Sequence, residues 1–522
     1  MPTVSCSTEL STNPWAPDAI RRAAADVGIL LRFRSGTVRR RGARTWITAV
    51  FVGLTLAAAV VPALVPGAVA GPGAAHRHAF DLLLLLPTAM AGFLLLAVVS
   101  AVASGGGREL FARDQAVAYP VSPTTDHLGA LLLSPLNIAW LIQAWTLLGT
   151  TSFVLGPSLD LVPGELAMLL WLVAATTIAQ VVAWSMEAVR RRPRGVIATR
   201  TLVGAVALVA AWLQLSGHLT SALDRVPTVW LVTGLIDGFG WTWAGRIAVL
   251  VTLVLGTVVL GAIPAHAGAR LASRDESKLE TRHYPPARLP RSVFGMLVRI
   301  DRGSVWRAVP MRRGLAVLSI GPGVIAFAGN LPWTTMTVLP GLVASGGALL
   351  FGVNAWCLDG RGTLMRESLP VSPDAVFGAR AYVLAECLAG VSLLTMLLAG
   401  LRAGLPSAAE LTALLCTMVV VTLQVVGASL RWSDRRPFPV DLRSARATPA
   451  PPIVMVGYSA RLATSTTLTG LVFSGLAHLP AWQLPVLVAL PFIGWSGIRL
   501  LHTRDRWVEP ANRARIVTSV SA

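Results

Sequence analysis

The charged and polar side chains that could take part in binding or catalysis are concentrated around two copies of one tetrapeptide. Pro-Val-Ser-Pro occurs at residues 120–123 and again at 370–373, each after a short charged stretch. No nucleophile stands beside a base in either loop, so the spacing does not predict catalysis. Opposite charges at an exposed rim orient a docking partner more than they strengthen its binding. The candidate residues are Arg108, Glu109, Arg113, Asp114, Pro120, Ser122 and Pro123 in the first loop, and Arg366, Glu367, Pro370, Ser372 and Pro373 in the second.

The sequence contains no motif that would bind the phosphates of a nucleotide. A phosphate-binding loop requires Gly-x-x-x-x-Gly-Lys-Ser/Thr, and the only lysine, Lys278, stands in Asp-Glu-Ser-Lys-Leu. We therefore expect no ATPase site, no bound cofactor and no metal site. Glu386 is the acidic residue deepest inside a predicted apolar segment. It either faces a transport path or the interface between halves, or pairs with a neighbour near the inner leaflet.

The elements that must position these residues are membrane helices. Of the 522 residues, 54% are hydrophobic and 13% are charged, and the mean hydropathy is +0.65. A soluble chain carries roughly 25% charged residues. The composition excludes a soluble one-domain enzyme, a disordered chain and a disulfide scaffold, and it predicts a protein embedded in the lipid bilayer.

Twelve apolar segments approach the length of about 20 residues that a membrane-spanning helix needs. The run at 201–219 is short, and the run at 455–477 is rich in threonine and serine. The predicted spans are 45–69, 80–104, 128–155, 163–186, 201–219, 243–266, 314–330, 334–358, 378–400, 408–430, 455–477 and 482–501. The residues 220–242 are expected to hold a re-entrant or interfacial outer helix.

The basic residues predict an orientation for these spans. With both termini in the cytoplasm, 40 of the 44 Lys and Arg residues fall in or beside cytoplasmic segments. Positive charge resists translocation, so this asymmetry favours that orientation in the cytoplasmic membrane. The net charge of +19 is spread between apolar runs and does not form one basic domain, which argues against nucleic-acid binding.

The spacing of the two tetrapeptides predicts an internal repeat. They lie 250 residues apart, close to half the chain, and each occupies the loop between the second and third span of its half. An even number of spans per half makes the halves parallel repeats. The predicted fold is therefore an all-α polytopic membrane protein with about 12 transmembrane helices in two parallel six-helix repeats. Its parts are a cytoplasmic N-terminal segment with an interfacial helix (1–44), a first half (45–266), a cytoplasmic linker with an interfacial helix (267–313), a second half (314–501) and a cytoplasmic tail (502–522).

Each tetrapeptide is a plausible helix start. Ser122 and Ser372 can cap a helix, and the prolines that follow fit the first helical position. The charged stretch before each copy is compatible with a short cytoplasmic helix. Such a loop is either a plain connector or a protruding helix that docks on a cytoplasmic partner.

The second loop resembles the exit from span two in permeases of ABC-type exporters. Asn354 is followed by Asp359 and Gly360, then by a short charged segment and the Pro-Val-Ser turn, which is the order found in that class. The first loop departs from it, because 101–107 replaces the Asn…Asp-Gly element. The basic amphipathic stretches 17–34 and 290–307 are similar to the interfacial helices that precede the first span in this class.

This resemblance implies the permease subunit of an ABC-type exporter with two fused six-span halves. The chain would move a hydrophobic or amphipathic compound, such as a drug, an antibiotic or a lipid, across the cytoplasmic membrane. Efflux of an antibiotic would confer resistance. ATP and Mg²⁺ would be bound by a separate cytoplasmic ATPase, expected in two copies and docked on the two loops.

Two other classes remain open from the residues alone. A secondary transporter of the major-facilitator type would share the twelve spans and parallel halves. Its characteristic loop contains Asp-Arg followed by glycine, whereas residues 113–114 read Arg-Asp with no following glycine. A polytopic membrane enzyme acting on lipid-linked sugars would favour acidic residues in the first outer loop, and residues 70–78 contain none.

Overall fold

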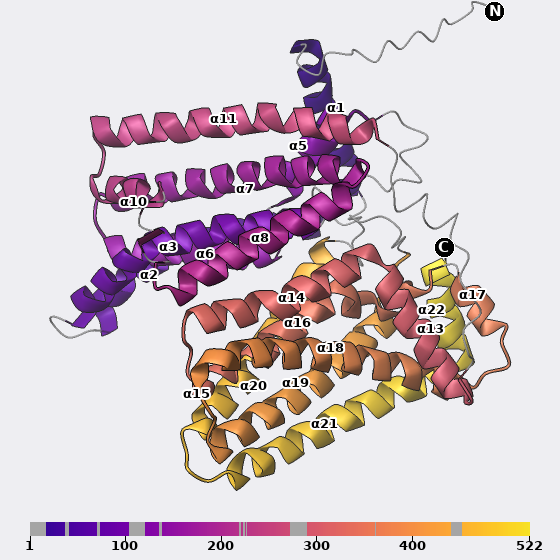
Figure 1. The fold of residues 1–522 in the computed structure, drawn as a ribbon. Helices are drawn as coiled ribbons and strands as arrows, with labels where there is room; N and C mark the ends of the chain where they lie inside the picture. The colour runs from indigo at the N-terminus through magenta and orange to yellow at the C-terminus, as the bar shows by residue number, and fades with distance from the viewer. Residues whose placement is uncertain are drawn as a thin grey trace, which may run out of the picture. The chain divides into compact units, whose positions relative to one another are not determined.

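The computed structural model describes residues 17–36, 41–69, 74–103, 121–134, 138–218, 221–222, 225, 227–271, 290–360, 362–439 and 452–521. Within those ranges every regular element is a helix (Figure 1). The chain forms two compact units, residues 1–282 and 283–522. Their boundary falls within the predicted linker 267–313.

The first unit is built around α7. This helix contacts α3, α6, α8, α10 and α11. Met168, Trp171 and Leu172 of α7 are buried in one apolar cluster with Leu86 of α3 and Leu148 of α6. Close van der Waals packing of such side chains helps to hold neighbouring helices together, in a membrane as well as in water. The helices of this unit are α1 (Pro17–Gly36), α2 (Arg41–Val69), α3 (Ala74–Ala103), α5 (Pro123–Leu133), α6 (Ile138–Leu155), α7 (Leu161–Arg191), α8 (Gly195–Leu215), α10 (Thr228–Ile236) and α11 (Trp241–Ala269).

The second unit is built around α18 and α19. The helix α18 contacts α13, α14 and α16, and α19 contacts α16, α20 and α21. Val420 of α19, Phe473 of α20 and Ala489 of α21 share one buried cluster. The helices of this unit are α13 (Val293–Arg307), α14 (Val309–Ala328), α15 (Trp333–Met336), α16 (Leu339–Phe351), the 3₁₀ helix η2 (Gly352–Leu358), α17 (Gly362–Glu367), α18 (Pro373–Ala403), α19 (Ala408–Arg435), α20 (Pro452–Ala477), α21 (Gln483–Val508) and α22 (Pro510–Ser521).

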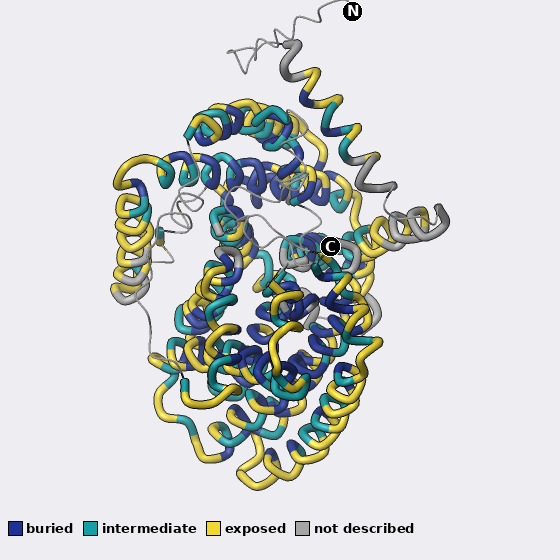
Figure 2. The backbone as a smooth tube through the Cα atoms, turned by 90° about the vertical axis from the view of Figure 1, so that its right-hand side faces the viewer, coloured by how far each residue is buried: buried dark blue, intermediate teal, exposed yellow. Residues whose placement is uncertain are grey.

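The helices carry the surface of a membrane protein. Among the described residues, eight helical stretches are long and apolar enough to cross a bilayer. Many large apolar side chains point outward, including Leu208 at 73% exposure and Leu487 at 60%. Along many helices one side is buried and the other exposed (Figure 2). Apolar side chains on that outer side suit contact with lipid. The protein is therefore an all-α, multi-pass membrane protein.

The eight stretches coincide with eight of the twelve predicted spans. They are 79–102, 161–191, 241–269, 311–328, 333–350, 373–403, 408–435 and 483–508. The other four predicted spans fall on α2, on α5 and α6, on α8 and on α20. The apolar parts of α2 and α8, 51–65 and 195–210, are shorter than a full span. The count of twelve and the two-repeat plan stay predictions.

Two predicted spans differ from single continuous helices. The span 128–155 falls on two helices, since α5 ends at Leu133 and α6 begins at Ile138. Pro135 stands between them, and a proline removes a helical hydrogen bond and disfavours helix in the residue before it. The span 334–358 is also divided, because α16 ends at Phe351 and η2 follows.

Within the described residues, five helices lie outside the predicted spans, namely α1, α10, α13, α17 and α22, and α10 falls within 220–242, where an outer helix was expected. The stretches 17–34 and 290–307 form α1 and α13, and Ser292 caps α13 by accepting the backbone N–H of Gly295. The residues 502–522, predicted only as a tail, continue α21 and then form α22. Ile516 and Val517 of α22 are buried, so this part of the chain packs as a folded element.

Candidate functional site

The second-half candidates lie in one stretch between α16 and α18, here called the 354–373 segment. It starts at Asn354, whose backbone is not helical (φ −148°, ψ 67°). The Asn354 Nδ2 donates to the carbonyl oxygen of Phe438 at 2.7 Å, just beyond the end of α19. The backbone N–H of Ala355 donates to Ser433 Oγ of α19, also at 2.7 Å. These two bonds fix the start of the segment to α19.

The middle of the segment turns at Gly360 and continues as α17. Gly360 has φ +50°, a left-handed conformation that glycine adopts without steric cost. Its carbonyl oxygen accepts the Thr363 hydroxyl at 2.6 Å. The segment ends where Ser372 Oγ accepts the backbone N–H of Ala375 at 3.3 Å and caps α18. The helix start predicted from Ser372-Pro373 is confirmed.

Four buried charges hold the segment to its neighbours, and we call Asp301, Asp359, Arg366 and Arg380 the four-charge ring. Arg366 donates through Nη2 to Asp301 Oδ1 at 2.5 Å and through Nη1 to Asp359 Oδ2 at 2.6 Å. Arg380 donates through Nε to Asp301 Oδ2 at 3.1 Å and through Nη2 to Asp359 Oδ2 at 2.5 Å. Each guanidinium bridges both carboxylates, so positive and negative groups alternate around the ring. The ring joins α13, the Gly360 turn, α17 and α18.

The four side chains of the ring are buried so deeply that removing one charge should destabilise the others. The exposed fractions of the side chains are 0% for Asp301, 1% for Arg380, and 9% for Asp359 and Arg366. The Nη1 of Arg380 donates outside the ring, to the carbonyl oxygen of Ala355 at 2.6 Å. Removing one partner from a buried ion pair costs roughly 3–5 kcal/mol, because an uncompensated charge stays in a low-dielectric site. The ring is therefore the strongest constraint on the 354–373 segment.

The structure separates the two charges expected at an exposed docking rim. The expectation fails for Arg366, whose side chain faces inward and forms two ion pairs of the ring. The carboxylate of Glu367 is 34% exposed and pairs with Arg513 of α22 at 3.0 Å. Arg366 thus positions the segment, and only Glu367 of this pair is available at the surface.

A second set of contacts ties the segment and the start of α18 to α21. The indole rings of Trp356 and Trp507 stack, with centroids 3.7 Å apart and planes inclined by 6°. The Trp507 Nε1 donates to the carbonyl oxygen of Pro373 at 3.1 Å. Arg504 also pairs with Asp374, in the first turn of α18, at 2.6 Å. Stacking of two buried aromatic rings adds about 0.5–1.5 kcal/mol beyond the area that they bury.

An exposed apolar pair on α17 was not among the sequence candidates. Leu364 is 53% exposed and Met365 is 73% exposed. Both lie on the short helix α17, where the next two residues, Arg366 and Glu367, are charged. Sequence signals for such a pair are weak, because two adjacent apolar residues in a charged stretch do not reveal which way they face. Exposed Leu and Met side chains on a rigidly held helix are typical of a protein-binding surface.

Cys357 lies beside the ring, and its environment makes it unreactive. Its side chain is buried, with 1% of its surface exposed. Only the thiolate is an effective nucleophile. The thiol should therefore react with a reagent in solution only when the segment opens.

Glu386, the predicted intramembrane candidate, is paired with a residue of α13. Arg302 donates to both carboxylate oxygens, through Nε to Oε2 and Nη2 to Oε1, each at 2.8 Å. The exposed fractions are 41% for Glu386 and 46% for Arg302. Of the two alternatives raised by the sequence, this geometry favours the pairing with a neighbour.

Of the candidate residues in the first loop, only Ser122 and Pro123 lie in the part of the chain that the structure describes. Arg108, Glu109, Arg113, Asp114 and Pro120 lie outside the described residues. Ser122 caps α5, and its Oγ accepts the backbone N–H of Thr125 at 3.0 Å, so the second predicted helix start is also confirmed. The position 250 residues before Arg380 is Ala130, so the first half has no arginine at the matching place.

The arrangement fixes the 354–373 segment to the helices around it. In the part of the chain that the structure describes, no three His, Cys, Asp or Glu side chains gather where they could hold a metal ion. The 354–373 segment connects two long apolar helices and is fixed to α13, α19 and α22. No protein-family model, curated protein or solved structure matches this chain.

Proposed function

We propose that this chain is the permease component of an ATP-driven exporter of the ABC type. It would move a hydrophobic or amphipathic compound across the cytoplasmic membrane, with both termini in the cytoplasm. A separate ATPase, in two copies, would bind ATP and Mg²⁺. Twelve spans in two parallel six-helix halves would then form the path, and the halves would rock against each other.

One observation carries the proposal, namely the way in which the 354–373 segment is held. A partner that closes on ATP can move membrane helices only through a rigid contact, because no covalent link joins the two proteins. The four-charge ring and the Trp356–Trp507 stack supply that rigidity. Displacing α17 would therefore displace α13 and the start of α18 with it, instead of deforming a loose connector.

The exposed pair on α17 is the best contact for the ATPase. Leu364 and Met365 are exposed on a helix whose position is fixed, because the adjacent Arg366 forms two ion pairs of the ring. Apolar anchors at the centre of an interface carry most of its binding energy, and charged rims set its orientation. Glu367 would serve as that rim charge.

The test is recovery of an ATPase with the tagged chain. We expect the full-length protein, purified gently from its native membranes, to bring down a P-loop ATPase and to show ATP hydrolysis only in that complex. Leu364→Ala/Met365→Ala should weaken the association at least tenfold, in line with losses of about 2 kcal/mol at interface anchors. The association is measured by quantitative mass spectrometry of the pull-down.

A matched control separates docking from general disturbance. Leu401, in the last turn of α18, and Leu405, just after that helix, are exposed at 74% and 98%, so Leu401→Ala/Leu405→Ala removes comparable apolar surface. This control should bind the ATPase as the wild type does. Export by the purified chain alone, driven by an ion gradient, would instead place the protein among secondary transporters.

A further inference from the structure

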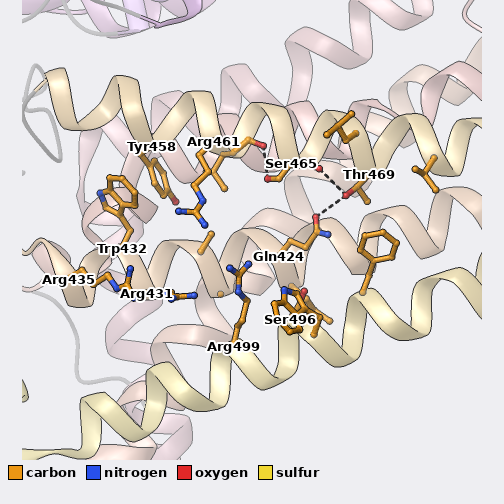
Figure 3. A pocket seen from close by; sticks show the side chains of 18 of the residues that line it. Gln424, Arg431, Trp432, Arg435, Tyr458, Arg461, Ser465, Thr469, Ser496 and Arg499 are labelled. Carbon is orange, nitrogen blue, oxygen red and sulfur yellow. Dashed lines mark hydrogen bonds between the residues drawn. The ribbon is translucent and has the colours of Figure 1, made fainter. Parts of the chain in front are cut away.

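A groove of about 680 Å³ lies between α20 and α21, with α19 as its floor (Figure 3). Both helices pack along α19. The volume falls within the range of about 300–1,000 Å³ that is typical of small-molecule sites. None of the residues that line it belongs to the 354–373 segment.

One end of the groove is strongly cationic. Arg431 and Arg435 come from α19, Arg461 from α20 and Arg499 from α21, and all four line the groove together with Arg436, which follows α19. Figure 3 shows the guanidinium groups of Arg431, Arg461 and Arg499 directed into the same space between the helices. The lining contains no Asp or Glu, and none of the four arginines pairs with a carboxylate among the residues that the structure describes.

Gathering these charges is unfavourable without an anion. Arg431 lies close enough to Arg435, Arg461 and Arg499 for their charges to oppose its own. Charged side chains on membrane helices normally pair with each other or face a polar path. The contrast with the four-charge ring is direct, since there each guanidinium has two carboxylate partners. The groove has the donors for an anion and supplies no counter-charge of its own.

The other end of the groove is apolar and open to the side. Leu468 and Val472 of α20 and Phe492 of α21 line it. Between the two ends, Thr469 Oγ1 donates to Gln424 Oε1 at 3.2 Å. Leu468 is 58% exposed, so an acyl chain could enter laterally without passing through the floor. The groove is thus amphipathic along its length.

We propose that this groove binds an anionic phospholipid, with the phosphate between the arginines and an acyl chain against Leu468 and Phe492. A phosphate accepts the paired N–H donors of guanidinium groups well. The charge distribution of the sequence predicts that the Arg435 end of α19 is cytoplasmic. Basic pockets between membrane helices on that side bind anionic headgroups. The site does not depend on the exporter proposal.

Lipid binding by the purified full chain tests this inference. The protein in a neutral detergent is titrated with dioleoyl phosphatidylglycerol, with dioleoyl phosphatidylcholine, and with inorganic phosphate, and bound lipid is counted by native mass spectrometry. We expect the anionic lipid to bind at least tenfold more tightly than the zwitterionic one. Arg431→Gln/Arg461→Gln/Arg499→Gln should remove that preference, since each basic residue adds roughly fivefold.

Two control variants show whether a loss of the preference for the anionic lipid comes from the groove arginines themselves or from the change in net charge. Arg192→Gln/Arg200→Gln/Arg270→Gln removes the same charge from exposed positions of the first unit and should keep the preference. Arg431→Lys/Arg461→Lys/Arg499→Lys keeps the charge in the groove and should bind within a few-fold of the wild type. The inference is overturned if the first control loses the preference equally, if the glutamine variant keeps it, or if inorganic phosphate displaces the lipid at equal concentration.

Discussion

Asp301 and Arg380 place two full charges where almost no solvent reaches them. Their exposed fractions are 0% and 1%. A buried ion pair is often no more stable than well-packed apolar residues of the same volume. Its distinctive property is geometric, because each guanidinium proton must face a particular oxygen. We therefore interpret the ring as a device that fixes where the 354–373 segment lies.

Loss of one residue of the four-charge ring should make the 354–373 segment open much more often. Arg380→Met leaves Asp301 and Asp359 with Arg366 as their one remaining partner in the ring, so one buried negative charge is uncompensated, at a cost of roughly 3–5 kcal/mol. We expect the thiol of Cys357 to be labelled by a maleimide at least a hundredfold faster in this variant. The measurement uses a protein in which the other three cysteines are replaced by alanine.

The control for that measurement is an ion pair at the surface of the same unit. Arg302→Met breaks the pair with Glu386, in which both side chains are more than 40% exposed and neither belongs to the ring. Its Cys357 labelling should stay within about fivefold of the wild type. Equal acceleration in both variants would contradict a special role for the ring.

At this scale the sequence predicted the motif residues but not their partners. Asn354, Asp359 and Gly360 follow a recognisable order, and Ser372 caps a helix as its Ser-Pro context predicts. Asp301 was not predicted as a partner, because it is 79 residues away from Arg380 and lies in a stretch that reads as a basic surface helix. Long-range ion pairs leave no trace in local spacing.

Among the elements, α22 has a role that its composition does not suggest. Its polar sequence predicts a solvated tail, yet Ile516, Val517 and Val520 are buried and Arg513 reaches Glu367 of α17. Three apolar residues spaced over two turns are enough to bury one face of a short helix. The helix contacts α17, η2 and the end of α21, so it can hold α17 in place.

Weakening the packing of α22 should loosen α17. Ile516→Ala removes a fully buried side chain and is expected to cost roughly 2–5 kcal/mol, up to the free energy of undocking the helix. Cys357 labelling should then accelerate at least tenfold. Thr518→Ala, at an exposed position of the same helix, should have little effect. An unchanged labelling rate with Ile516→Ala would show that α22 does not support the segment.

The element boundaries show where periodicity is informative and where it is not. Long apolar runs such as 163–186 and 408–430 correspond to continuous helices, α7 and α19. The run 128–155 falls on two helices, because α5 ends at Leu133 and α6 begins at Ile138. Hydropathy averaged over a window does not detect a single backbone interruption.

For the whole molecule, composition alone predicted the membrane class. A charged fraction of 13% leaves too few polar residues to cover a soluble surface of this size. The number of spans is harder to predict, because short helices such as α8 and broken ones such as α5 and α6 depend on what surrounds them. Each unit has its own buried clusters.

The orientation of the whole chain is testable by single-cysteine labelling. Ser368→Cys, at an exposed position after α17, should react with a membrane-impermeant reagent only in inverted vesicles. Ser221→Cys, in the predicted outer segment, should react in intact cells. The physical reason is the resistance of basic segments to translocation. Labelling of residue 368 from outside would reverse the predicted topology.

The contacts of Trp507 and Arg513 have a consequence for the timing of biosynthesis. These residues lie 134 and 146 positions beyond their partners Pro373 and Glu367. At a synthesis rate of about 5–20 residues per second, a nascent chain spends roughly 7–30 s with α17 made but not yet supported. The segment therefore matures late, after the helices around it have been inserted. A chain whose synthesis ended within that interval would enter the membrane with the 354–373 segment lacking its contacts to α21 and α22.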